Sequence, residues 1–266
     1  MNALIPSLVC VLIAGTTSAE LINHWTLDEG SGTAVTDSIN GNNGVFSPLD
    51  ATGPQWATTN LPSVPSGTSA AVDFDGTADH IAITGYTGIS GTGSRTISAW
   101  IRTRNTGTNQ NMSIVSWGQN TSGAKNTFRV QSNNGAPGTL RFEVNGGYAV
   151  GSTVLTDGLW HHVAMTWEND GSPNVTDTLL YVDGILETLS ISQTQTISTG
   201  SSADVRIGTD FAGRPWNGWI DDVRIYDEAL AAEDIFAIAT GVPEPSTAIL
   251  LLSGLAFLAS RRVMRR

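Results

Sequence analysis

The chain has 266 residues. Between its two unusual ends, residues 1–19 and 242–266, lies a body of roughly 220 residues, a length that is common for one all-β domain. Asp and Glu number 24 against 13 Lys and Arg, so the formal net charge is −11, which disfavours binding to the phosphates of nucleic acids. Glycine is abundant at 29 residues and charged residues make up only 14%, a balance that favours short strands and tight turns over helices.

Residues 1–19 are typical of a secretory signal peptide. An apolar stretch from Ala3 to Ala14 precedes the small residues Thr17-Ser18-Ala19, which resemble a cleavage site for signal peptidase. The alternative is a first buried strand. The only cysteine, Cys10, lies inside the apolar stretch, so we expect the mature protein to have no disulfide, no zinc-thiolate site and no cysteine nucleophile.

Four segments of the body alternate apolar and polar residues, which predicts antiparallel strands with one apolar face. Asn-Gly and Asp-Gly pairs, which tolerate the positive φ of tight hairpins, punctuate the body. The alternating segments span 128–131, 140–145, 162–167 and 223–225, and the turn pairs are Asn145-Gly146, Asp183-Gly184 and Asn217-Gly218.

One long loop and one helix complete the expected body, residues 20–241. We interpret residues 58–70, rich in Pro, Gly and Ser, as a surface loop, because a domain boundary there would leave an N-terminal fragment too small for its own core. Residues 228–239 read as a short helix, and we expect Ala231 to Ala239 to pack across one end of the sandwich.

The C-terminal end, residues 242–266, combines an apolar run with a cluster of arginines. The run from Ala248 to Ala259 is shorter than the ~20 residues that span a bilayer comfortably, which suggests a transient contact with the inner membrane. The positive-inside rule would keep the arginines cytoplasmic. The arginines are Arg261, Arg262, Arg265 and Arg266.

This end resembles the PEP-CTERM sorting signal of Gram-negative bacteria. In both, a Pro-Glu-Pro motif, here Pro243, Glu244 and Pro245 after Val242, precedes an apolar run and a cluster of arginines. The resemblance implies that an exosortase cuts near these prolines and passes the protein to the cell surface or extracellular matrix. An ordinary tail anchor is the alternative.

Six segments of the body occur in the order typical of laminin-G-like, concanavalin A-like domains. The resemblance implies an all-β fold, an antiparallel β-sandwich of the jelly-roll type with one short helix near the C-terminal end of the domain. The segments are "HWTLDEGSGTAVTDSINGNNG", "AVDFDGTADHI", "TISAWIR", "WHHVAMTWE", "LLYVDGIL" and "NGWIDDVRIYDEALAAEDI".

The sequence lacks the carboxylate pattern of glycoside hydrolases, which need two carboxyl groups facing one another across the sugar. A run such as Glu-x-Asp-x-Glu would place them on one face of a strand, and no such run occurs. Asp73 and Asp75 share a face but border a glycine turn, and the neighbours Asp221 and Asp222 are expected on opposite faces. We therefore expect no enzyme. The remaining glutamates, among them Glu143, Glu168 and Glu187, are scattered.

Other catalytic signatures are also missing from the sequence. His161 and His162 are neighbours on a predicted strand and point to opposite sides, so they cannot chelate one metal ion together. We interpret them as packing and hydrogen-bonding residues. No nucleophile elbow, phosphate-binding loop or dinucleotide fingerprint occurs.

The resemblance implies one possible cofactor, Ca²⁺, where the loop after the first strand meets the last strand. Carboxylates and backbone carbonyls suit this hard cation. The matching positions are Asp28 or Asp37 together with Asp221, and a second pattern of the family points to Asp79. The alternative is that Asp37 caps its loop and that Asp221 is a buried hydrogen-bonding residue.

The eight tryptophans suggest carbohydrate binding, because aromatic rings stack on the apolar faces of sugars. Trp25, Trp100, Trp160 and Trp167 lie in strand patterns and are expected to be core or structural residues. The alternative for the remaining aromatics is packing over the edge of the sandwich. The candidates for ligand binding are Trp56, Trp117, Trp216 and Trp219, with Tyr86 and Tyr148 added.

The sequence therefore predicts an exported, surface or matrix protein that binds extracellular polysaccharide or matrix components without catalysis. Two alternatives stay open: a structural matrix or sheath protein without a small ligand, and a hydrolase with dispersed carboxylates.

Overall fold

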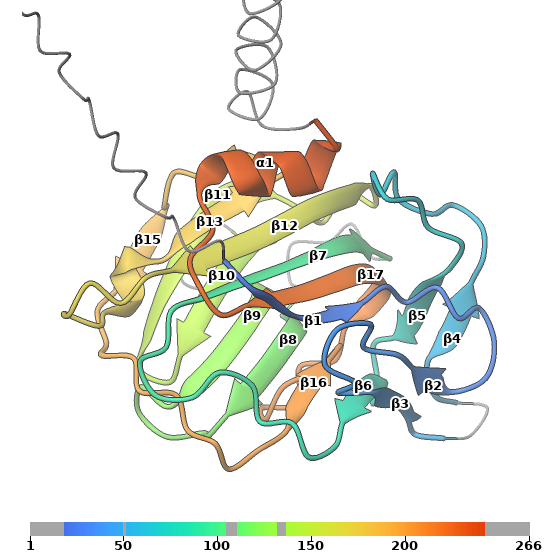
Figure 1. Ribbon diagram of the computed structural model, residues 1–266, viewed down its shortest axis with the longest axis horizontal. Coiled ribbons are helices and arrows are strands. Elements are labelled where there is room, and N and C mark those ends of the chain that lie inside the picture. Colours follow the sequence, from blue (N-terminus) through green and yellow to red (C-terminus); the bar gives the residue numbers. More distant parts are fainter. Residues whose placement is uncertain (1–18, 50–51, 105–110, 132–136, 243–266) are drawn as a thin grey trace, which may run out of the picture.

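The computed structural model describes residues 19–49, 52–104, 111–131 and 137–242, and its strands form two stacked sheets (Figure 1). All pairs of neighbouring strands between residues 21 and 226 of the described chain are antiparallel. The predicted all-β sandwich is therefore confirmed.

The first sheet has eight strands in the order β14-β13-β12-β7-β17-β5-β4, with β1 also paired to β17. Its longest strands, β7 and β17, lie at the centre, so residues far apart in the sequence meet there. The strands are β1 (Leu21–Trp25), β4 (Gln55–Ala57), β5 (Ala71–Asp75), β7 (Arg95–Thr103), β12 (Trp160–Trp167), β13 (Leu179–Val182), β14 (Ile185–Leu186) and β17 (Asn217–Tyr226).

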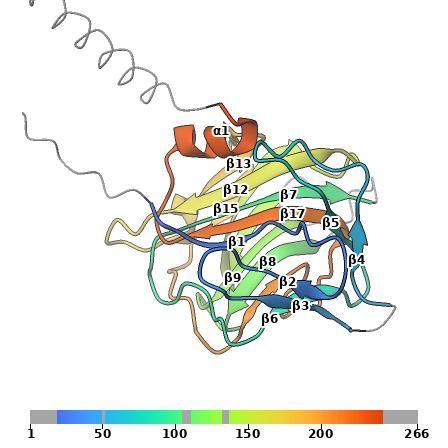
Figure 2. The ribbon, with the colours of Figure 1, turned by 45° about the vertical axis from the view of Figure 1, so that its right-hand side comes forward.

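The second sheet has nine strands in the order β15-β11-β10-β9-β8-β16-β6-β3-β2 and lies beneath the first sheet in Figure 2. The strands are β2 (Ala34–Val35), β3 (Gly44–Ser47), β6 (His80–Ile83), β8 (Met112–Gly118), β9 (Lys125–Gln131), β10 (Thr139–Val144), β11 (Gly147–Val154), β15 (Ile191–Gln193) and β16 (Val205–Ile207).

The core fills the space between the two sheets and follows the alternation of the strands. Phe128 of β9 lies opposite Phe142 of β10, and Val163 of β12 lies opposite Ala99 of β7, all without exposed surface. Side chains of the opposite parity point away from this core. The outer face of each sheet therefore carries the polar and charged residues of the same strands.

The helix α1 (Ala232–Thr240) lies on the outer face of the first sheet rather than across one end of the sandwich (Figure 1). Its Ile235 packs with Ala164 of β12, Tyr181 of β13 and Tyr226 of β17. The expected helix is thus correct in type and differs in position, because only the assembled sheet brings residues of β12, β13 and β17 together into the small apolar surface that it covers. A single turn of 3₁₀ helix (Val175–Asp177) precedes β13.

Two of the three predicted turn pairs are confirmed, since Asn145-Gly146 joins β10 to β11 and Asp183-Gly184 joins β13 to β14. The third, Asn217-Gly218, is wrong, because these residues begin β17. A Cβ atom on Gly218 would lie 2.1 Å from the carbonyl oxygen of Arg102, so this glycine permits close approach of β7 instead of a turn.

The predicted long loop, residues 58–70, folds back over the outer face of the first sheet, where Thr68 contacts Asp221 of β17. Residues 1–18, Pro243, Glu244, Pro245, the apolar run and the terminal arginines lie outside the described residues. Within 19–49, 52–104, 111–131 and 137–242, no helix is long and apolar enough to cross a membrane.

Candidate functional site

The structure does not gather the six predicted aromatic residues into one surface. Trp117 and Trp216 have no exposed surface and belong to the core, so the interpretation of these two as ligand-contacting residues is wrong. A ring that is enclosed on all sides cannot stack on a sugar. The indole of Trp117 donates from Nε1 to the carbonyl oxygen of Ile89 at 2.9 Å, which fixes the 89–93 loop to the core.

Trp56 and Tyr86 are half-buried and pack against the core from its edge. The ring of Trp56 lies 5.0 Å from that of Phe46, and its Nε1 donates to the carbonyl oxygen of Gly32 at 2.8 Å. Burial raises the pKa of Tyr86 to about 12. Trp56 therefore fixes the segment before β2 to β3, and Tyr86 packs against the core beside Trp25, as the alternative interpretation expected.

Trp219 lies in a row of residues that crosses the outer face of the first sheet. Strand register places Trp160 of β12 opposite Arg102 of β7, Arg102 opposite Trp219 of β17, and Trp219 opposite Asp73 of β5. The guanidinium carbons of Arg102 and Arg104 lie 5.0 and 4.5 Å from the centre of the Trp219 ring. Arg104 also forms an ion pair with Asp73.

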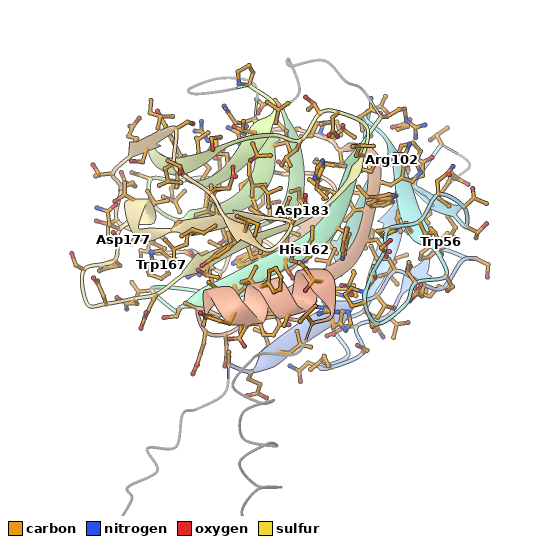
Figure 3. All side chains as sticks on the ribbon, turned by 90° about the horizontal axis from the view of Figure 1, so that it is seen from above. Trp56, Arg102, His162, Trp167, Asp177 and Asp183 are labelled. Atoms are coloured by element: carbon orange, nitrogen blue, oxygen red, sulfur yellow. The ribbon has the colours of Figure 1, made fainter. Side chains whose placement is uncertain are left out.

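We call Trp160, Arg102, Trp219 and Arg104 the tryptophan–arginine row. All four are partly exposed or exposed, and Figure 3 shows Arg102 toward the same end of the molecule as Trp56, beyond the helix. Trp160, which was expected to be a core or structural residue, lies outside the core. The side chain of Trp160 points outward from β12, and its Nε1 donates a hydrogen bond to the carbonyl oxygen of Asn60 at 2.5 Å.

Tyr148 lies on the other side of the molecule, on the outer face of the second sheet. This face carries an ion-pair network around Glu143 of β10, and the network also includes Asp210 from the connection between β16 and β17. We call this group the charged network. Its cations are Lys125 and Arg129 of β9, Arg141 of β10 and Arg214, and the guanidinium carbon of Arg141 lies 3.9 Å from the centre of the Tyr148 ring.

Glu143 is the centre of the charged network. Its carboxylate lies 3.0 Å from Nζ of Lys125, 2.8 Å from Nη2 of Arg129 and 2.9 Å from Nη2 of Arg141. Burial opposes ionisation of Glu143, and the three cations outweigh it, so they hold the pKa of Glu143 far below its usual value. The alternation in the sequence correctly predicts that these polar side chains point outward. It does not show that β9 and β10 bring them together, or that they are buried.

The charged network also bears on the hydrolase alternative. Lys125 forms ion pairs with two carboxylates. Its Nζ lies 3.0 Å from a carboxylate oxygen of Glu143 and 3.6 Å from a carboxylate oxygen of Asp210. A glycosidase needs one of its pair to carry a proton at working pH. Glu143 has the opposite electrostatic environment, because its pKa is lowered.

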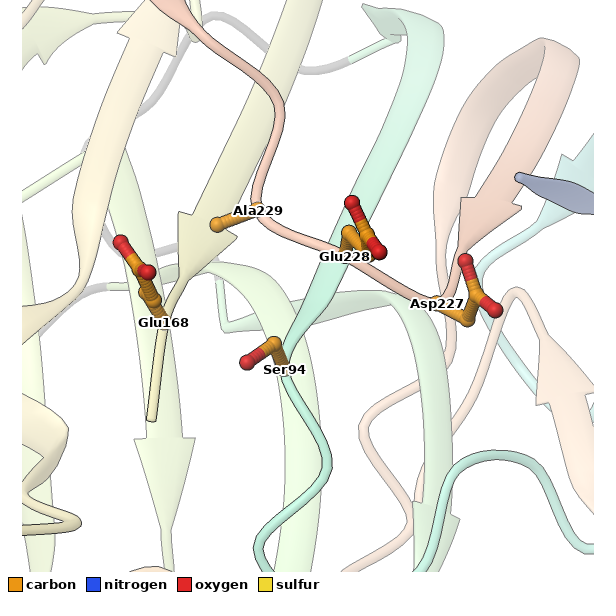
Figure 4. A pocket seen from close by; sticks show the side chains of 5 residues that line it. All are labelled: Ser94, Glu168, Asp227, Glu228 and Ala229. Carbon is orange, nitrogen blue, oxygen red and sulfur yellow. The ribbon is translucent and has the colours of Figure 1, made fainter. Parts of the chain in front are cut away.

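Other carboxylates surround a hollow of about 460 Å³ at one end of the neighbouring strands β12, β7 and β17, which is lined by Ser94, Glu168, Asp227, Glu228 and Ala229 (Figure 4). Figure 4 shows Glu168 and Glu228 on either side of Ala229. Glu168 and Asp227 are exposed, and Asp227 accepts a hydrogen bond from the backbone N–H of Glu20 at 3.1 Å. Exposed carboxylates lack the dry surroundings that hydrolases use to separate an acid from a base.

A second polar cluster lies beneath the 58–70 loop. The hydroxyl oxygen of Thr68 lies 3.1 Å from Oδ1 of Asp28, 2.9 Å from Oδ2 of Asp221 and 2.8 Å from the carbonyl oxygen of Ala70. A hydroxyl has one proton to donate, so these three acceptors compete for it. Burial, with the nearby charges of Asp222 and Asp28, raises the pKa of Asp221 to about 8.

The expectation that Asp221 and Asp222 point to opposite faces is wrong. A bulge interrupts the pairing of β17 with β7 between Asp221 and Arg224, and Asp222 adopts a φ of 49°. Asp222 thus accepts from Nε2 of His24 at 2.6 Å and pairs with Arg224, and it lines a cavity of about 170 Å³ that Asp28 and Thr68 also line. Asp tolerates this backbone conformation better than most residues.

His161 and His162 do point to opposite sides. The ring of His161 lies 2.9 Å from a carboxylate oxygen of Asp183, which raises the pKa of His161. His162 is 1% exposed, lies beside the helix in Figure 3 and packs edge-on against Trp100, and burial lowers its pKa to about 4. His162 is therefore a neutral packing residue at neutral pH.

The four candidate metal ligands do not form one group. Asp37 accepts hydrogen bonds from Nδ2 of Asn23 at 2.7 Å and from the backbone N–H groups of His24, Ile39, Asn40 and Asn42, so it caps its loop. Asp79 accepts from the backbone N–H of Asp75 at 2.9 Å within the turn between β5 and β6. No three His, Cys, Asp or Glu side chains of the described chain could together hold a metal ion.

A family model for the concanavalin A-like lectin/glucanases superfamily matches residues 75–236, which is more than half of the chain and includes both outer faces described above. The chain belongs to this superfamily. Residues 241–266 match the PEP-CTERM protein-sorting motif, which indicates an exported protein that an exosortase sorts to the cell surface. Both predicted resemblances are therefore confirmed.

Solved structures with the same fold include several binding domains. Domain 4 of AbnA, a GH43 extracellular arabinanase from Geobacillus stearothermophilus, in complex with arabinotriose, has a TM-score of 0.61 and 18% identity over 84% of this chain and 99% of that domain. The binding domain of botulinum neurotoxin serotype G has a TM-score of 0.53 and 13% identity over 83% of this chain and 50% of the domain.

The chain thus spans about half the length of the toxin domain and nearly the full length of the arabinanase domain. At these identities the likeness establishes the fold alone. No curated protein matches the sequence.

Proposed function

We propose that the protein is an exported, non-catalytic module of the cell surface or matrix that binds extracellular polysaccharide. The tryptophan–arginine row is the observation that carries this proposal. The binding of arabinotriose by a domain of the same fold supports it. After export, exosortase processing near Pro243 would place the domain outside the cell, and surface labelling of intact cells tests this location.

The chemistry of the row suits a sugar chain. Tryptophan rings offer flat apolar surfaces to the C–H faces of pyranoses, and guanidinium groups donate hydrogen bonds to hydroxyl and ring oxygens. Trp160 and Trp219 are two strands apart, which corresponds to about 10 Å at the usual strand spacing. The row is therefore an extended surface, which suits a polymer better than a small molecule.

The absence of catalysis is part of the proposal. One pair of neighbouring carboxylates, Glu143 and Asp210, is held by Lys125 and Arg214. The cations favour ionised carboxylates, whereas the reaction needs one protonated acid. Release of reducing sugar by the purified protein would contradict this part.

Replacing Trp219 by Ala is expected to weaken polysaccharide binding at least about tenfold, because a partly exposed tryptophan flanked by arginines is a typical hot spot. Affinity electrophoresis of the purified protein in gels that contain polysaccharide measures the effect. Phe236→Ala is the matched control, since Phe236 is 39% exposed on α1 and lies outside the row.

Two outcomes contradict the proposal. Unchanged binding by Trp219→Ala would remove the row as the contact surface. Absence of any polysaccharide ligand on a glycan array would favour the structural matrix or sheath protein instead.

We also propose that one Ca²⁺ binds between Asp28 and Asp221. The competing acceptors around Thr68 support this proposal, because a cation would satisfy both carboxylates and the carbonyl oxygen of Ala70 together. Asp37 and Asp79 are not included, since neither lines the cavity beneath the 58–70 loop that Asp28 and Thr68 line.

Calcium is expected to raise the melting temperature of EDTA-treated protein by several degrees, since a ligand of the folded state stabilises it. Differential scanning calorimetry and calorimetric titration measure the effect. Asp221→Asn should lose this response and Asp79→Asn should keep it. Neither heat of binding nor a shift in melting temperature for the unaltered protein would contradict the proposal.

A further inference from the structure

The ring of His161 lies between two carboxylates, and the proposed function gives none of the three groups a role. Its Nδ1 lies 2.9 Å from Oδ2 of Asp183, and its Nε2 lies 3.2 Å from Oδ2 of Asp157. A neutral imidazole has one N–H, so only the protonated ring can donate to both carboxylates at once. The hydrogen bond to Asp183 is accordingly the main cause that raises the pKa of His161 above its usual 6.5.

The two carboxylates belong to different turns, and each is also held by the backbone. Asp183 lies in the turn between β13 and β14, and its Oδ1 accepts from the backbone N–H of His162 at 2.9 Å. Asp157 lies in the connection between β11 and β12, and its Oδ1 accepts from the backbone N–H of Leu159 at 2.8 Å. The protonated ring of His161 therefore ties one turn to the other.

The turn before β12 carries one end of the tryptophan–arginine row. The carbonyl oxygen of its Gly158 accepts a hydrogen bond from Nε of Arg102 at 2.7 Å. The guanidinium carbon of Arg102 lies 5.0 Å from the centre of the Trp219 ring. Trp160, the first residue of the row, comes directly after the same turn. The positions of Arg102 and Trp160 thus depend on a turn that His161 anchors.

The charge on His161 is set by the two turns that its ring joins. Asp183 and Asp157 are the charged groups of the described chain that act on the ring, and Ile101, which lies opposite on β7, is apolar. Loss of the proton would leave one ring nitrogen with a lone pair that faces a carboxylate, so one hydrogen bond would be lost. A polymer that binds the row would then have to order the turn as well, and this ordering weakens binding.

We propose that His161 is a positioning residue of the tryptophan–arginine row, and that its protonated ring, held between Asp157 and Asp183, strengthens polysaccharide binding at mildly acidic pH. This inference rests on the proposed polysaccharide-binding function and adds a regulation of the same surface. It gives a role to the first histidine of the "WHH" segment, residues 160–162.

Nuclear magnetic resonance tests the positioning without a ligand. As the pH rises from about 5.5 to about 9, the range in which histidine titrates, we expect the carbon signals of the Arg102 guanidinium and of the Trp160 ring to shift with the midpoint of the His161 ring. His161→Gln should remove this transition, because glutamine has no charge to lose. Signals of Arg102 and Trp160 that stay constant while His161 titrates would overturn the inference.

Isothermal titration tests the effect on binding, with linear arabinan and with the tightest neutral polysaccharide of the glycan array as probes, since neutral polymers keep the same charge at every pH. Between pH 5.5 and pH 9 we expect the affinity of the unaltered protein to fall about threefold more than that of His161→Gln, the usual size of the effect of partly exposed ion pairs. Asp183→Asn should reduce the fall, since asparagine tolerates the φ of 51° at this position and carries no charge.

His80→Gln is the matched control and should keep the fall, because His80 of β6 lies outside the row and its Nδ1 contacts the backbone carbonyl of Ala78. Asp221, with a pKa of about 8, titrates in the same range in every variant, so the comparison between variants cancels its contribution. Thermal melting at both pH values shows that each variant is folded.

The outcomes separate the two proposals. An affinity that changes with pH equally in the unaltered protein and in His161→Gln overturns this inference and leaves polysaccharide binding intact. Absence of binding to arabinan and to every polysaccharide on the glycan array overturns both.

Discussion

In the presence of EDTA, the free energy of unfolding of the unaltered protein is expected to fall relative to that of Asp221→Asn as the pH rises from about 4 to about 8. The comparison with the variant cancels the opposite contribution of His162, whose pKa is lowered to about 4. Asp221 has no exposed surface, and burial together with Asp222 and Asp28 raises its pKa from 3.8 to about 8. Between these two values the folded protein keeps a proton that the unfolded chain releases. Stability is therefore lost with rising pH, by about 1.4 kcal/mol per pH unit for a single group.

Urea unfolding at pH 5 and pH 8.5 measures the effect. At pH 8.5 the variant should exceed the unaltered protein by several kcal/mol on this scale, because an amide has no charge to bury. Asp73→Asn, which changes a half-buried carboxylate outside this cluster, serves as the control and should retain the fall. Parallel pH profiles for the unaltered protein and Asp221→Asn would contradict the expectation.

Glu143→Gln is expected to lower the free energy of unfolding by about 3–5 kcal/mol, the usual cost of breaking a buried ion pair by removing one partner. Lys125, Arg129 and Arg141 would remain buried, with Asp210 as the carboxylate left to the network. An amide can accept a hydrogen bond but cannot balance charge. The loss should be greatest above the range in which Glu143 ionises, and it should diminish only in strong acid, since the pKa of Glu143 is lowered.

Equilibrium unfolding in urea at neutral pH measures this loss. Glu233→Gln is the matched control, because Glu233 is exposed in the first turn of α1 and its removal should cost less than about 1 kcal/mol. A change at Glu143 as small as that at Glu233 would show that the network contributes little to stability.

The sequence by itself determined the fold to a large extent. Alternation around Phe128, Phe142 and Val163 correctly indicated which side chains enter the core, because the strand period of two fixes the face within a few residues. The hairpins at Asn145-Gly146 and Asp183-Gly184 are local in the same way. Both family resemblances rest on motifs that can be read along the chain, and the comparisons confirm them.

Tertiary structure decided which polar residues meet. Trp219 contacts Arg102 and Arg104, and the carboxylate of Asp221 contacts Thr68, across more than 100 positions of sequence. Such contacts depend on strand register, and a shift of one residue would send each side chain to the other face. No local signal marked the bulge that turns Asp222 toward His24.

Burial of outward-facing residues was the other property that alternation could not supply. Arg129 and Arg141 occupy the polar positions of their strands, whose side chains point away from the core, yet both residues are almost completely buried. Likewise Trp117 and Trp216 lie near glycine-rich segments and still reach the core. A strand pattern determines toward which side a residue points, whereas exposure depends on what distant segments place over that side, and this is fixed only when the whole chain packs.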